Sequence, residues 1–478
     1  MTDARLSDDR TIAGRADLLI IPAFTTAEGG AEPASPWPFE DDRIARLLAR
    51  DKSFTGEPGQ LSALLLADHL PPVLALGLGR RDRIDADTLR RGAMAAARAS
   101  SGRGACVFAC ESLSMDMGIA IRAVSEGFLL GRYDYAKTDT VSFTVLTRST
   151  DQRNFTIGRT AARHANWARR LVETPPNTLP PRVFADILVA EAKKLGIGAE
   201  IWDDDTLAQR GFGALKAVGG GSKNAPLAVR LEHGSGIKRL GLAGKGMTFD
   251  SGGINLKRKL SEIAWMKADM AAAAAVAGAV FAAVELGADP DILAILPIAE
   301  NMPSGSAVRP GDVVTHPDGR RTEITDTDCE GRLILADAIA CLAESNVEAI
   351  IDVGTLTDGG GVGTALWGCW TNEASLAKSM TEAGERAGEP GWHLPLRAEY
   401  ERLLASKVAD IANYSLEAGD SGQLAATYLK SFAGAKPWLH IDIGACAYLE
   451  QASPPWPQGA TGAPLRALLQ FLLDRSPS

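Results

Sequence analysis

Three short segments in the second half of the 478-residue chain place acidic and basic residues together, two of them beside glycine. Residues 244–257 read GKGMTFDSGGINLK and follow a strand-like apolar run, Asp269 precedes an alanine-rich stretch, and residues 325–332 read TDTDCEGR. Carboxylates packed together are costly unless cations neutralise them. Hard oxygen donors without histidine suit Mg²⁺ or Mn²⁺, and Zn²⁺ also accepts Asp and Glu. The segments predict a metal or oxyanion site at a strand end, where open α/β sheets place their sites.

Each segment also has an alternative interpretation that needs no metal ion. Residues 244–257 suggest a phosphate-binding loop, but Gly246 follows Lys245 and the first glycine of the Walker pattern is missing. Asp269 alone would favour the N-terminus of the helix that follows it. Asp328 and Glu330 would project to one side of an extended segment, or belong to a solvated acidic loop. Their occurrence together favours the metal or oxyanion site.

The composition excludes several classes of protein. The chain carries 50 Lys and Arg against 59 Asp and Glu, so its net charge of −9 lacks the positive surface that general nucleic-acid binding needs. Its six histidines are dispersed, and neither HExxH nor a CxxC pattern followed by histidine occurs, which excludes a histidine- or cysteine-rich zinc site. A metal site in this chain must therefore rely mainly on carboxylates.

The sequence favours a reducing compartment. The six cysteines are scattered, and Cys106 and Cys110 lie in an apolar stretch where we expect buried packing. The acidic N-terminus lacks the apolar core of an export signal. The apolar run at 270–284 is shorter than the ~17–25 residues of a membrane span, so we expect a buried core helix and no membrane partner. We expect a cytoplasmic protein.

Strand-like and helical stretches alternate along the whole chain. A basic helical stretch at 156–173 ends at the breaker TPPNTLPP, residues 174–181, because a helix cannot continue through so many prolines. The predicted strands are 18–24, 73–78, 239–243, 292–297, 349–353 and 439–443, and the other predicted helices are 87–99, 271–285, 333–344 and 423–432.

This alternation predicts an α/β protein of two domains. Residues 1–150 would form a smaller N-terminal α/β domain. Residues 151–478 would form a larger C-terminal α/β domain, a central mixed sheet covered by helices, with residues 151–180 as a linker helix and proline-rich lead-in.

The C-terminal part resembles the M17 leucyl aminopeptidases, dinuclear metallopeptidases of the cytosol. The family phrases GKG-x-TFDSGG-x-x-LK, MK-x-DM, ENMPSG-x-x-RPGD and NTD-A-EGRL-x-LADA occur in this order, at 244–257, 266–270, 300–312 and 326–338. The resemblance covers residues 155–470 and includes the matching segments 170–177, 407–413 and 438–443. The first 150 residues match only in length and α/β character.

The resemblance implies a site for two divalent cations, Zn²⁺, Mn²⁺ or Mg²⁺. Asp250 and Glu330 would bridge the two ions, Asp328 would complete the first site, and Lys245 and Asp269 the second. A lysine ligand must be neutral, and nearby dications lower its pKa. Water held between the ions would be the nucleophile. The substrate's free α-amine would bind a metal, so that only the N-terminal residue of a peptide is removed.

Two further residues would act on the reaction. By resemblance, Lys257 would stabilise the oxyanion, and Arg332 would hold a bicarbonate ion that serves as general base. All seven positions carry the expected residue type, so we expect an active metal-dependent aminopeptidase. The family resemblance also implies a homohexamer. The alternative, a DNA-binding accessory or regulatory protein with residual peptidase activity, is disfavoured by the net charge and by the acid-interrupted basic residues at 80–83 and 90–91.

The chain departs from the family phrases near the predicted site. Asp326 stands where the family has Asn, and Cys329 where it has Ala. Arg258 replaces a proline in a segment that is one residue longer than usual. The resemblance implies that the backbone N–H at Cys329 helps to hold bicarbonate, so we expect that change to be silent. We expect the longer segment to shift the affinity for the second metal.

The largest departure is Asp358, in the segment GTLTDGGG at 354–361. It replaces a glycine that lines the family's pocket for the residue being removed, whose other walls would be Met266, Thr355, Gly444 and Ala447. Two hypotheses stay open. Asp358 either makes the pocket prefer Arg or Lys through a charge-assisted contact, or it turns outward or pairs locally, and specificity stays broad.

Overall fold

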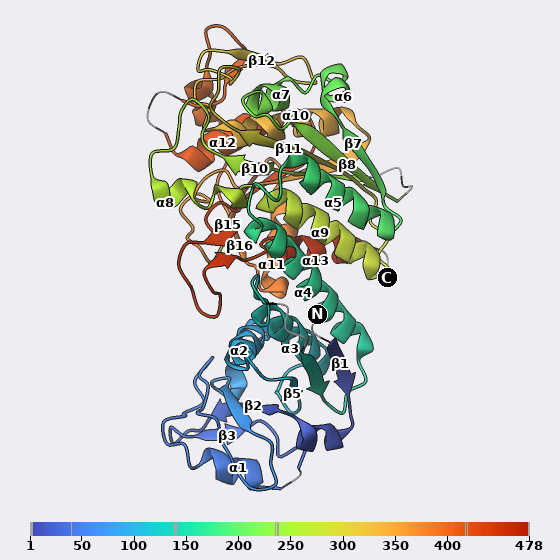
Figure 1. Ribbon diagram of the computed structural model, residues 1–478, viewed down its shortest axis with the longest axis vertical. Helices are drawn as coiled ribbons and strands as arrows, with labels where there is room; N and C mark the ends of the chain where they lie inside the picture. Colours follow the sequence, from blue (N-terminus) through green and yellow to red (C-terminus); the bar gives the residue numbers. More distant parts are fainter. Residues whose placement is uncertain are drawn as a thin grey trace. The chain divides into compact units, whose positions relative to one another are not determined.

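The computed structural model describes residues 3–39, 41–137, 141–234, 236, 239–415, 417 and 419–476. It divides into two compact units, shown in Figure 1: Met1–Asn166 with Ala452–Pro457, and Trp167–Gln451 with Gln458–Ser478. The division falls within helix α4 (Gln152–Glu173), which begins close to the boundary that the sequence places after residue 150. Both units are α/β, so the predicted fold class is confirmed.

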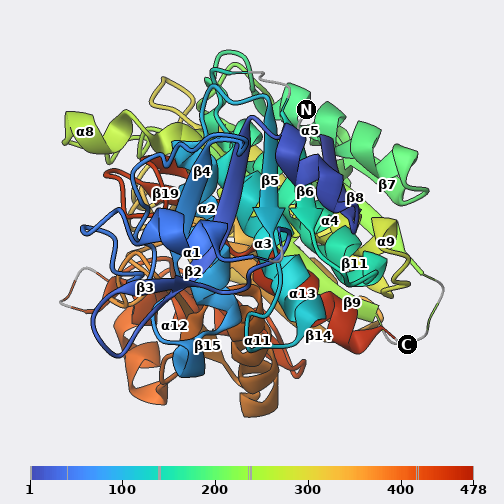
Figure 2. The ribbon, with the colours of Figure 1, turned by 90° about the horizontal axis from the view of Figure 1, so that it is seen from below.

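The N-terminal unit is built on a mostly parallel sheet of six described strands (Figure 2). They are β1 (Asp3–Ser7), β2 (Leu18–Thr25), β3 (Ala31–Pro33), β4 (Val73–Gly77), β5 (Ala105–Ala109) and β6 (Ser142–Leu146). Their order is β1-β6-β5-β2-β3, with β4 also pairing with β2, and only β3 runs antiparallel to its neighbour. Strands β2 and β4 are continuous apolar runs because both their faces are buried.

Helices complete the N-terminal unit: α1 (Arg43–Leu48), α2 (Ala86–Ala99) and α3 (Met117–Gly131), with 3-10 turns η1 (Arg10–Arg15) and η2 (Arg81–Arg83). Helices α2 and α3 pack together, and Arg90 of α2 pairs with the buried Glu126 of α3 at 2.9 Å. The apolar residues of β2, β4 and β5 form the core with α1 and Trp37.

The C-terminal unit is built on a mixed sheet of nine described strands. They are β7 (Gly198–Trp202), β8 (Leu227–His233), β9 (Arg239–Gly244), β10 (Gly246–Asp250), β11 (Ile292–Asn301), β14 (Val347–Gly354), β15 (Trp367–Thr371), β16 (Gly391–His393) and β18 (Trp438–Asp442). Their order is β16-β15-β18-β14-β9-β11-β8-β7, with β10 pairing with β11. The central strands β18, β14, β9, β11 and β10 run parallel to their neighbours in this group.

Two small sheets accompany the large one. One consists of β12 (Val313–Thr315), β13 (Arg321–Glu323) and β17 (Ile411–Ala412), and the other of β19 (Tyr448–Leu449) and β20 (Gly459–Ala460). The helices are α5 (Pro181–Lys194), α6 (Asp204–Gln209), α7 (Gly213–Gly219), α8 (Leu260–Ile263), α9 (Ala271–Glu285), α10 (Glu330–Glu344), α11 (Ala374–Ala387), α12 (Ser421–Lys430) and α13 (Leu465–Arg475), with 3-10 turns η3 (Met266–Ala268) and η4 (Ala398–Leu404).

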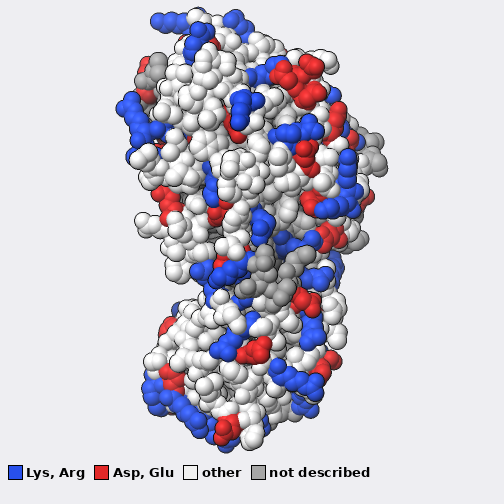
Figure 3. Space-filling view, viewed as in Figure 1, with Lys and Arg blue, Asp and Glu red and all other residues white. Residues whose placement is uncertain are grey.

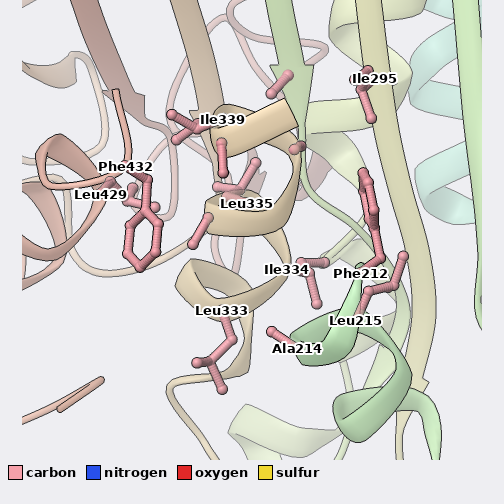
Figure 4. Close-up of a cluster of buried hydrophobic side chains, with 14 of the residues drawn as sticks. Phe212, Ala214, Leu215, Ile295, Leu333, Ile334, Leu335, Ile339, Leu429 and Phe432 are labelled. Carbon is pink, nitrogen blue, oxygen red and sulfur yellow. The ribbon is translucent and has the colours of Figure 1, made fainter. Parts of the chain in front are cut away.

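Helices cover both faces of the large sheet (Figure 1). Helices α7, α10 and α12 pack on one face, and α5, α9 and α13 lie on the other. The largest described core cluster surrounds α10, whose Leu333, Ile334 and Leu335 are fully buried (Figure 4). Phe212 and Leu215 reach this cluster from the α7 side, and Leu429 and Phe432 from the α12 side (Figure 4).

The predicted helix at 271–285 is confirmed as α9. Its alanines allow a close approach to the sheet, where the Ala273 N–H donates to the Lys245 carbonyl at 3.0 Å. Together with η3 it forms a 20-residue apolar stretch, Met266–Glu285, which is long enough to cross a membrane, contrary to the length expected from the sequence. Because 89% of its most apolar window is buried in the protein, it has the character of a core helix of a soluble protein.

Candidate active site

The predicted site residues gather at one edge of the large sheet. The parallel strands β9, β14 and β18 end at Gly244, Gly354 and Asp442, and β10 and β11 end at Asp250 and Asn301. The loops that follow these strands meet at the same edge, outside the carboxyl ends of the strands. This edge is where the structure places the residues predicted from the sequence.

Asp250, Asp328 and Glu330 form an acidic cluster. One carboxylate oxygen from each lies within 4.8 Å of those of the other two. Asp250 and Glu330 are almost completely buried, at 2% and 1% exposure, and Asp328 is partly buried. Asp269, at the end of η3, is also buried.

Two lysines bridge the acidic groups. The Lys245 ammonium lies 2.9 Å from Asp269 Oδ1 and 2.7 Å from Glu330 Oε1. The Lys257 ammonium lies 2.9 Å from Asp250 Oδ2 and 2.6 Å from Asp328 Oδ1. Each lysine thus joins two carboxylates that come from different segments of the chain.

The ionisation of these groups reflects burial and crowding. Burial, followed by the charges of Asp250 and Glu330, raises the pKa of Asp328 to about 7 despite Lys257. Burial also raises the pKa of Asp269 and of Glu330. For Lys245, burial alone would lower the pKa, but the surrounding carboxylates outweigh it and raise the pKa above its usual range. The cluster thus gathers more carboxylates than ammonium groups, an unfavourable arrangement that a bound cation would relieve.

Asp250 is fixed by a tight turn. Its Oδ1 accepts hydrogen bonds from Gly252 N at 2.9 Å and from Asn301 Nδ2 at 2.8 Å. Gly252 adopts a φ of +89°, and a Cβ there would lie 2.9 Å from Asp328 Oδ1. Glycine is therefore needed both for the backbone conformation and for the close approach of Asp328.

The local structure of the third segment differs from the sequence prediction. The sequence pattern predicted an extended segment for Asp328 and Glu330, but residues 327–328 form a turn and Glu330 is the first residue of α10. The prediction of an extended segment is wrong because the helix begins earlier than its apolar pattern indicates. The two carboxylates nevertheless converge, since the turn directs Asp328 toward the start of the helix.

One carboxylate oxygen of Asp269, Oδ2, has no hydrogen-bond partner among the described residues. Thr355 Oγ1 donates to Asp269 Oδ1 at 2.6 Å, and the Thr355 carbonyl accepts from Lys245 Nζ at 2.9 Å. No described residue makes a hydrogen bond to Asp269 Oδ2, although this atom is buried. A buried carboxylate oxygen without a partner beside three more carboxylates is suited to a hard divalent cation.

Arg332 is buried beside this site at 2% exposure. Its Nη1 donates to the Asn413 carbonyl at 3.1 Å, and its guanidinium lies 5.6 Å from the centre of the Tyr414 ring. Among the described residues, no carboxylate lies within ion-pairing distance, 4.0 Å, of Arg332. A buried guanidinium with only a carbonyl and an aromatic ring as described partners is suited to hold an anion.

The residues predicted to line the substrate pocket lie on η3 and on the loops after β14 and β18. Met266 and Ala447 are buried, and Thr355 contacts Asp269. Asp358 is exposed, and its Oδ1 accepts a hydrogen bond from Gly360 N at 3.1 Å. Its described hydrogen bond therefore stays within its own loop.

Asp442 ties these loops together. It accepts hydrogen bonds from Leu356 N at 3.2 Å and Thr357 Oγ1 at 2.5 Å in the loop after β14, and from Gly444 N at 2.9 Å in its own loop. Asp442 is a site residue that the sequence motifs did not predict. Its position in the apolar segment 438–443 could have indicated a structural role, because a charged residue in an apolar strand needs hydrogen-bond or ion-pair partners.

Comparisons with known proteins agree with this geometry. The model of the cytosol aminopeptidase family, catalytic domain, matches residues 166–469. The chain belongs to the cytosol aminopeptidase family. The N-terminal domain of the same family matches residues 40–140. Membership makes the chain an aminopeptidase-type enzyme, a hydrolase of the metallo-exopeptidase class, and confirms the resemblance seen in the sequence phrases.

Relatives in the cytosol aminopeptidase family match over most of the chain. A probable cytosol aminopeptidase of Streptomyces griseus subsp. griseus is 36% identical over 98% of both chains. One of Corynebacterium glutamicum is 38% identical over 85% of this chain and 83% of its own. The solved structure of the bottromycin maturation enzyme BotP in complex with Mn is similar with a TM-score of 0.86 and 36% identity, covering 96% of this chain and 99% of the other.

If the acidic cluster holds divalent cations, these ions must stabilise the folded state. We predict that Mn²⁺ at 100 times its Kd raises the free energy of unfolding by about 2.7 kcal/mol, because it binds the assembled cluster and not the unfolded chain. Calorimetry of the chelator-treated protein with and without Mn²⁺ measures this. Glu330→Gln should lose most of the increase. Glu300→Gln, a buried control whose carboxylate accepts hydrogen bonds from Ser222 and Asn224, should retain it.

Proposed function

We propose that the chain is a metal-dependent aminopeptidase that removes the N-terminal residue from peptides, with two divalent cations held by the acidic cluster, Asp269 and Lys245. The observation that carries this proposal is the convergence of four carboxylates and two lysines at the sheet edge, with Asp269 Oδ2 left without a described partner. The Mn in the similar structure of BotP supports divalent cations of the first transition row. Zn²⁺, Mn²⁺ and Mg²⁺ all suit such donors.

The residues divide between the two cations. Asp250 and Glu330 would contact both, Asp328 would complete one site, and Asp269 and Lys245 the other. Such cations supply a lowered pKa for bound water and polarise the peptide carbonyl. To act as an electron-pair donor, Lys245 Nζ must lose its proton. The carboxylates of Asp269 and Glu330 favour the protonated form, and dications bound beside them would neutralise these charges and lower the pKa of Lys245.

Lys257 is placed to stabilise negative charge. Its ammonium lies beside Asp250 and Asp328. Burial alone would lower the pKa of Lys257, but the charges of Asp250, Glu330 and Asp328 outweigh it and leave the pKa raised. Once cations neutralise these carboxylates, the Lys257 Nζ hydrogens become available to the developing oxyanion of the peptide carbonyl. The Lys257 ammonium is thus a preformed hydrogen-bond donor in a site that is partly shielded from solvent.

Arg332 would hold the general base as a bound anion. Its guanidinium is buried and lacks a described carboxylate partner, and a bicarbonate ion fits its fork of donors. The described site offers no histidine, and its carboxylates are committed to the cations. A bound bicarbonate would therefore accept the proton from the attacking water.

The substrates are peptides with a free α-amine, and we propose broad specificity for the residue removed. The excess of carboxylates at the site favours a substrate that brings an amine. Asp358 is exposed and hydrogen-bonded within its own loop, which supports the hypothesis of local pairing over selection of Arg or Lys.

We further propose a cytoplasmic homohexamer, as the family membership suggests. The names of the relatives as probable cytosol aminopeptidases support this location. On the face shown in Figure 3, basic and acidic side chains intermingle, which gives no support to the alternative of a DNA-binding accessory protein.

The activity is tested with leucine p-nitroanilide. We predict that a chelator or Glu330→Ala reduces hydrolysis to background, and that Mn²⁺ restores the chelated wild type but not the variant, because Glu330 contacts both cations. N-acetyl-leucine p-nitroanilide should remain uncleaved throughout, since its amine is blocked. Activity that survives both the chelator and the variant contradicts the metal-dependent mechanism.

The role of Lys257 gives a second prediction. Lys257→Met keeps the length of the side chain but removes its charge, so kcat at saturating Mn²⁺ should fall about 10²–10³-fold, the cost of losing one oxyanion donor. Steady-state kinetics on leucine p-nitroanilide measure this. Lys259→Met is the matched control, because Lys259 is exposed on the same loop. An unchanged kcat in Lys257→Met would remove Lys257 from the mechanism.

The specificity proposal is tested at Asp358. We predict that the ratio of kcat/KM for arginine and leucine p-nitroanilide is the same in the wild type and in Asp358→Gly, because the carboxylate pairs within its loop. A charge-assisted contact is worth about 1.5–3 kcal/mol. If Asp358 made such a contact with arginine, Asp358→Gly would lower the arginine-to-leucine ratio of kcat/KM tenfold or more. That outcome would favour the basic-residue hypothesis.

A further inference from the structure

The side chain of Asn413 binds the loop that carries Asp328. Its Oδ1 accepts hydrogen bonds from Thr325 N at 2.8 Å, Thr325 Oγ1 at 3.1 Å and Asp326 N at 3.3 Å. Its Nδ2 donates to the Asp326 carbonyl at 2.7 Å and the Cys329 carbonyl at 3.3 Å. Asn413 is fully buried. A single amide thus holds both ends of residues 325–329.

The backbone around Asn413 extends this attachment. The Asn413 N–H donates to the Glu323 carbonyl at 3.0 Å, and the Asn413 carbonyl accepts from Arg332 Nη1 at 3.1 Å. The next carbonyl, of Tyr414, accepts from Thr325 Oγ1 at 2.7 Å. Arg332 and the loop before α10 are therefore anchored to the same residue.

Residues 325–329 need such an anchor because they lie outside any strand or helix. They connect β13 to α10, and a buried N–H or carbonyl in such a loop costs free energy unless it is paired. An asparagine side chain is suited to pair both kinds of group, since it carries an acceptor oxygen and a donor nitrogen. The helix start gives little help, because Cys329 makes no side-chain capping bond.

We propose that Asn413 is a positioning residue that sets the spacing of Asp328, Glu330 and Arg332. It acts on two groups at once: the carboxylates that would bind the cations, and the guanidinium that would bind the anion. This inference rests on the proposed metal-dependent function. Its specific content is that cation affinity depends on a residue that touches no cation.

The proposal requires an amide side chain at position 413, with both its oxygen and its nitrogen. Asn413→Asp would keep the acceptor toward Thr325 and Asp326 but direct an oxygen at two carbonyls in place of Nδ2. The loss of those donated bonds, together with repulsion between oxygens, should move the Cys329 end of the loop, next to Glu330. Asn413→Ala would remove all five bonds.

The test measures Mn²⁺ binding by the full chain after chelation, by titration calorimetry. Residues that hold metal ligands in place typically contribute 10–100-fold to metal affinity, so Asn413→Asp and Asn413→Ala should raise the Kd for Mn²⁺ by that factor. Thr325→Val, which removes only one hydroxyl from the same network, should raise the Kd less, in the same direction. The thermal midpoint of each chelated variant is recorded beside the Kd.

A control at an exposed asparagine separates positioning from general destabilisation. Asn372 also clamps backbone from both sides, with Nδ2 donating to the Lys436 carbonyl at 2.9 Å and Oδ1 accepting from Trp438 N at 2.7 Å. Asn372→Ala should lower the thermal midpoint without changing the Kd for Mn²⁺. An equal change of Kd in Asn372→Ala and Asn413→Ala would overturn the proposal, because the effect would then follow from lost stability.

The remaining outcomes are also decisive. Folded Asn413 variants that bind Mn²⁺ as tightly as the wild type would overturn the inference while leaving the proposed function intact. A wild type that binds no Mn²⁺ would contradict the proposed function itself. If the Asn413 variants do not fold, Thr325→Val decides, since an unchanged Kd in that folded variant would equally overturn the proposal.

Discussion

The repulsion among buried carboxylates is the constraint on which the site depends. The cluster holds four carboxylates, those of Asp250, Asp269, Asp328 and Glu330. Among the described residues, two ammonium groups, those of Lys245 and Lys257, lie within ion-pairing distance and offset part of this negative charge. Two carboxylate charges therefore remain uncompensated by described residues, in surroundings that weaken solvation. Burial consequently raises the pKa values of Asp269, Asp328 and Glu330. Hydrogen bonds from the neighbouring segments hold the acids in this arrangement, to Asp250 from Gly252 and Asn301 and to Asp269 from Thr355.

The fold provides that confinement with ordinary α/β elements. Parallel strands end at one edge, where the loops that follow them meet, and the helices on the two faces pack against those strands in a largely apolar core. Histidine serves the scaffold in this unit: His316 pairs with Asp337 at 2.7 Å and His440 with Asp352 at 2.6 Å, all four fully buried. The scarcity of histidine thus matches a site built on carboxylates, while His316 and His440 form buried pairs with aspartates.

Much of this organisation could be predicted from the sequence, for identifiable reasons. Continuous apolar runs predicted β2 and β4 because buried parallel strands need no polar face, and the alanine pattern predicted α9 with its observed ends. The start of α10 at Glu330 could not be predicted, since Cys329 provides no capping signal. The part played by Asn413 was equally hidden, because its partners lie more than 80 residues away and no periodicity links them.

The order of these parts along the chain has a consequence for protein synthesis. Every acidic residue of the site has been made by position 330, yet Asn413 comes 83 residues later and β18, which pairs with β14, later still. Chains emerge from the ribosome N-terminus first. A nascent chain therefore exposes the acids well before the residues that bring them together, and the candidate site can be assembled only after Asn413 and β18 have been made.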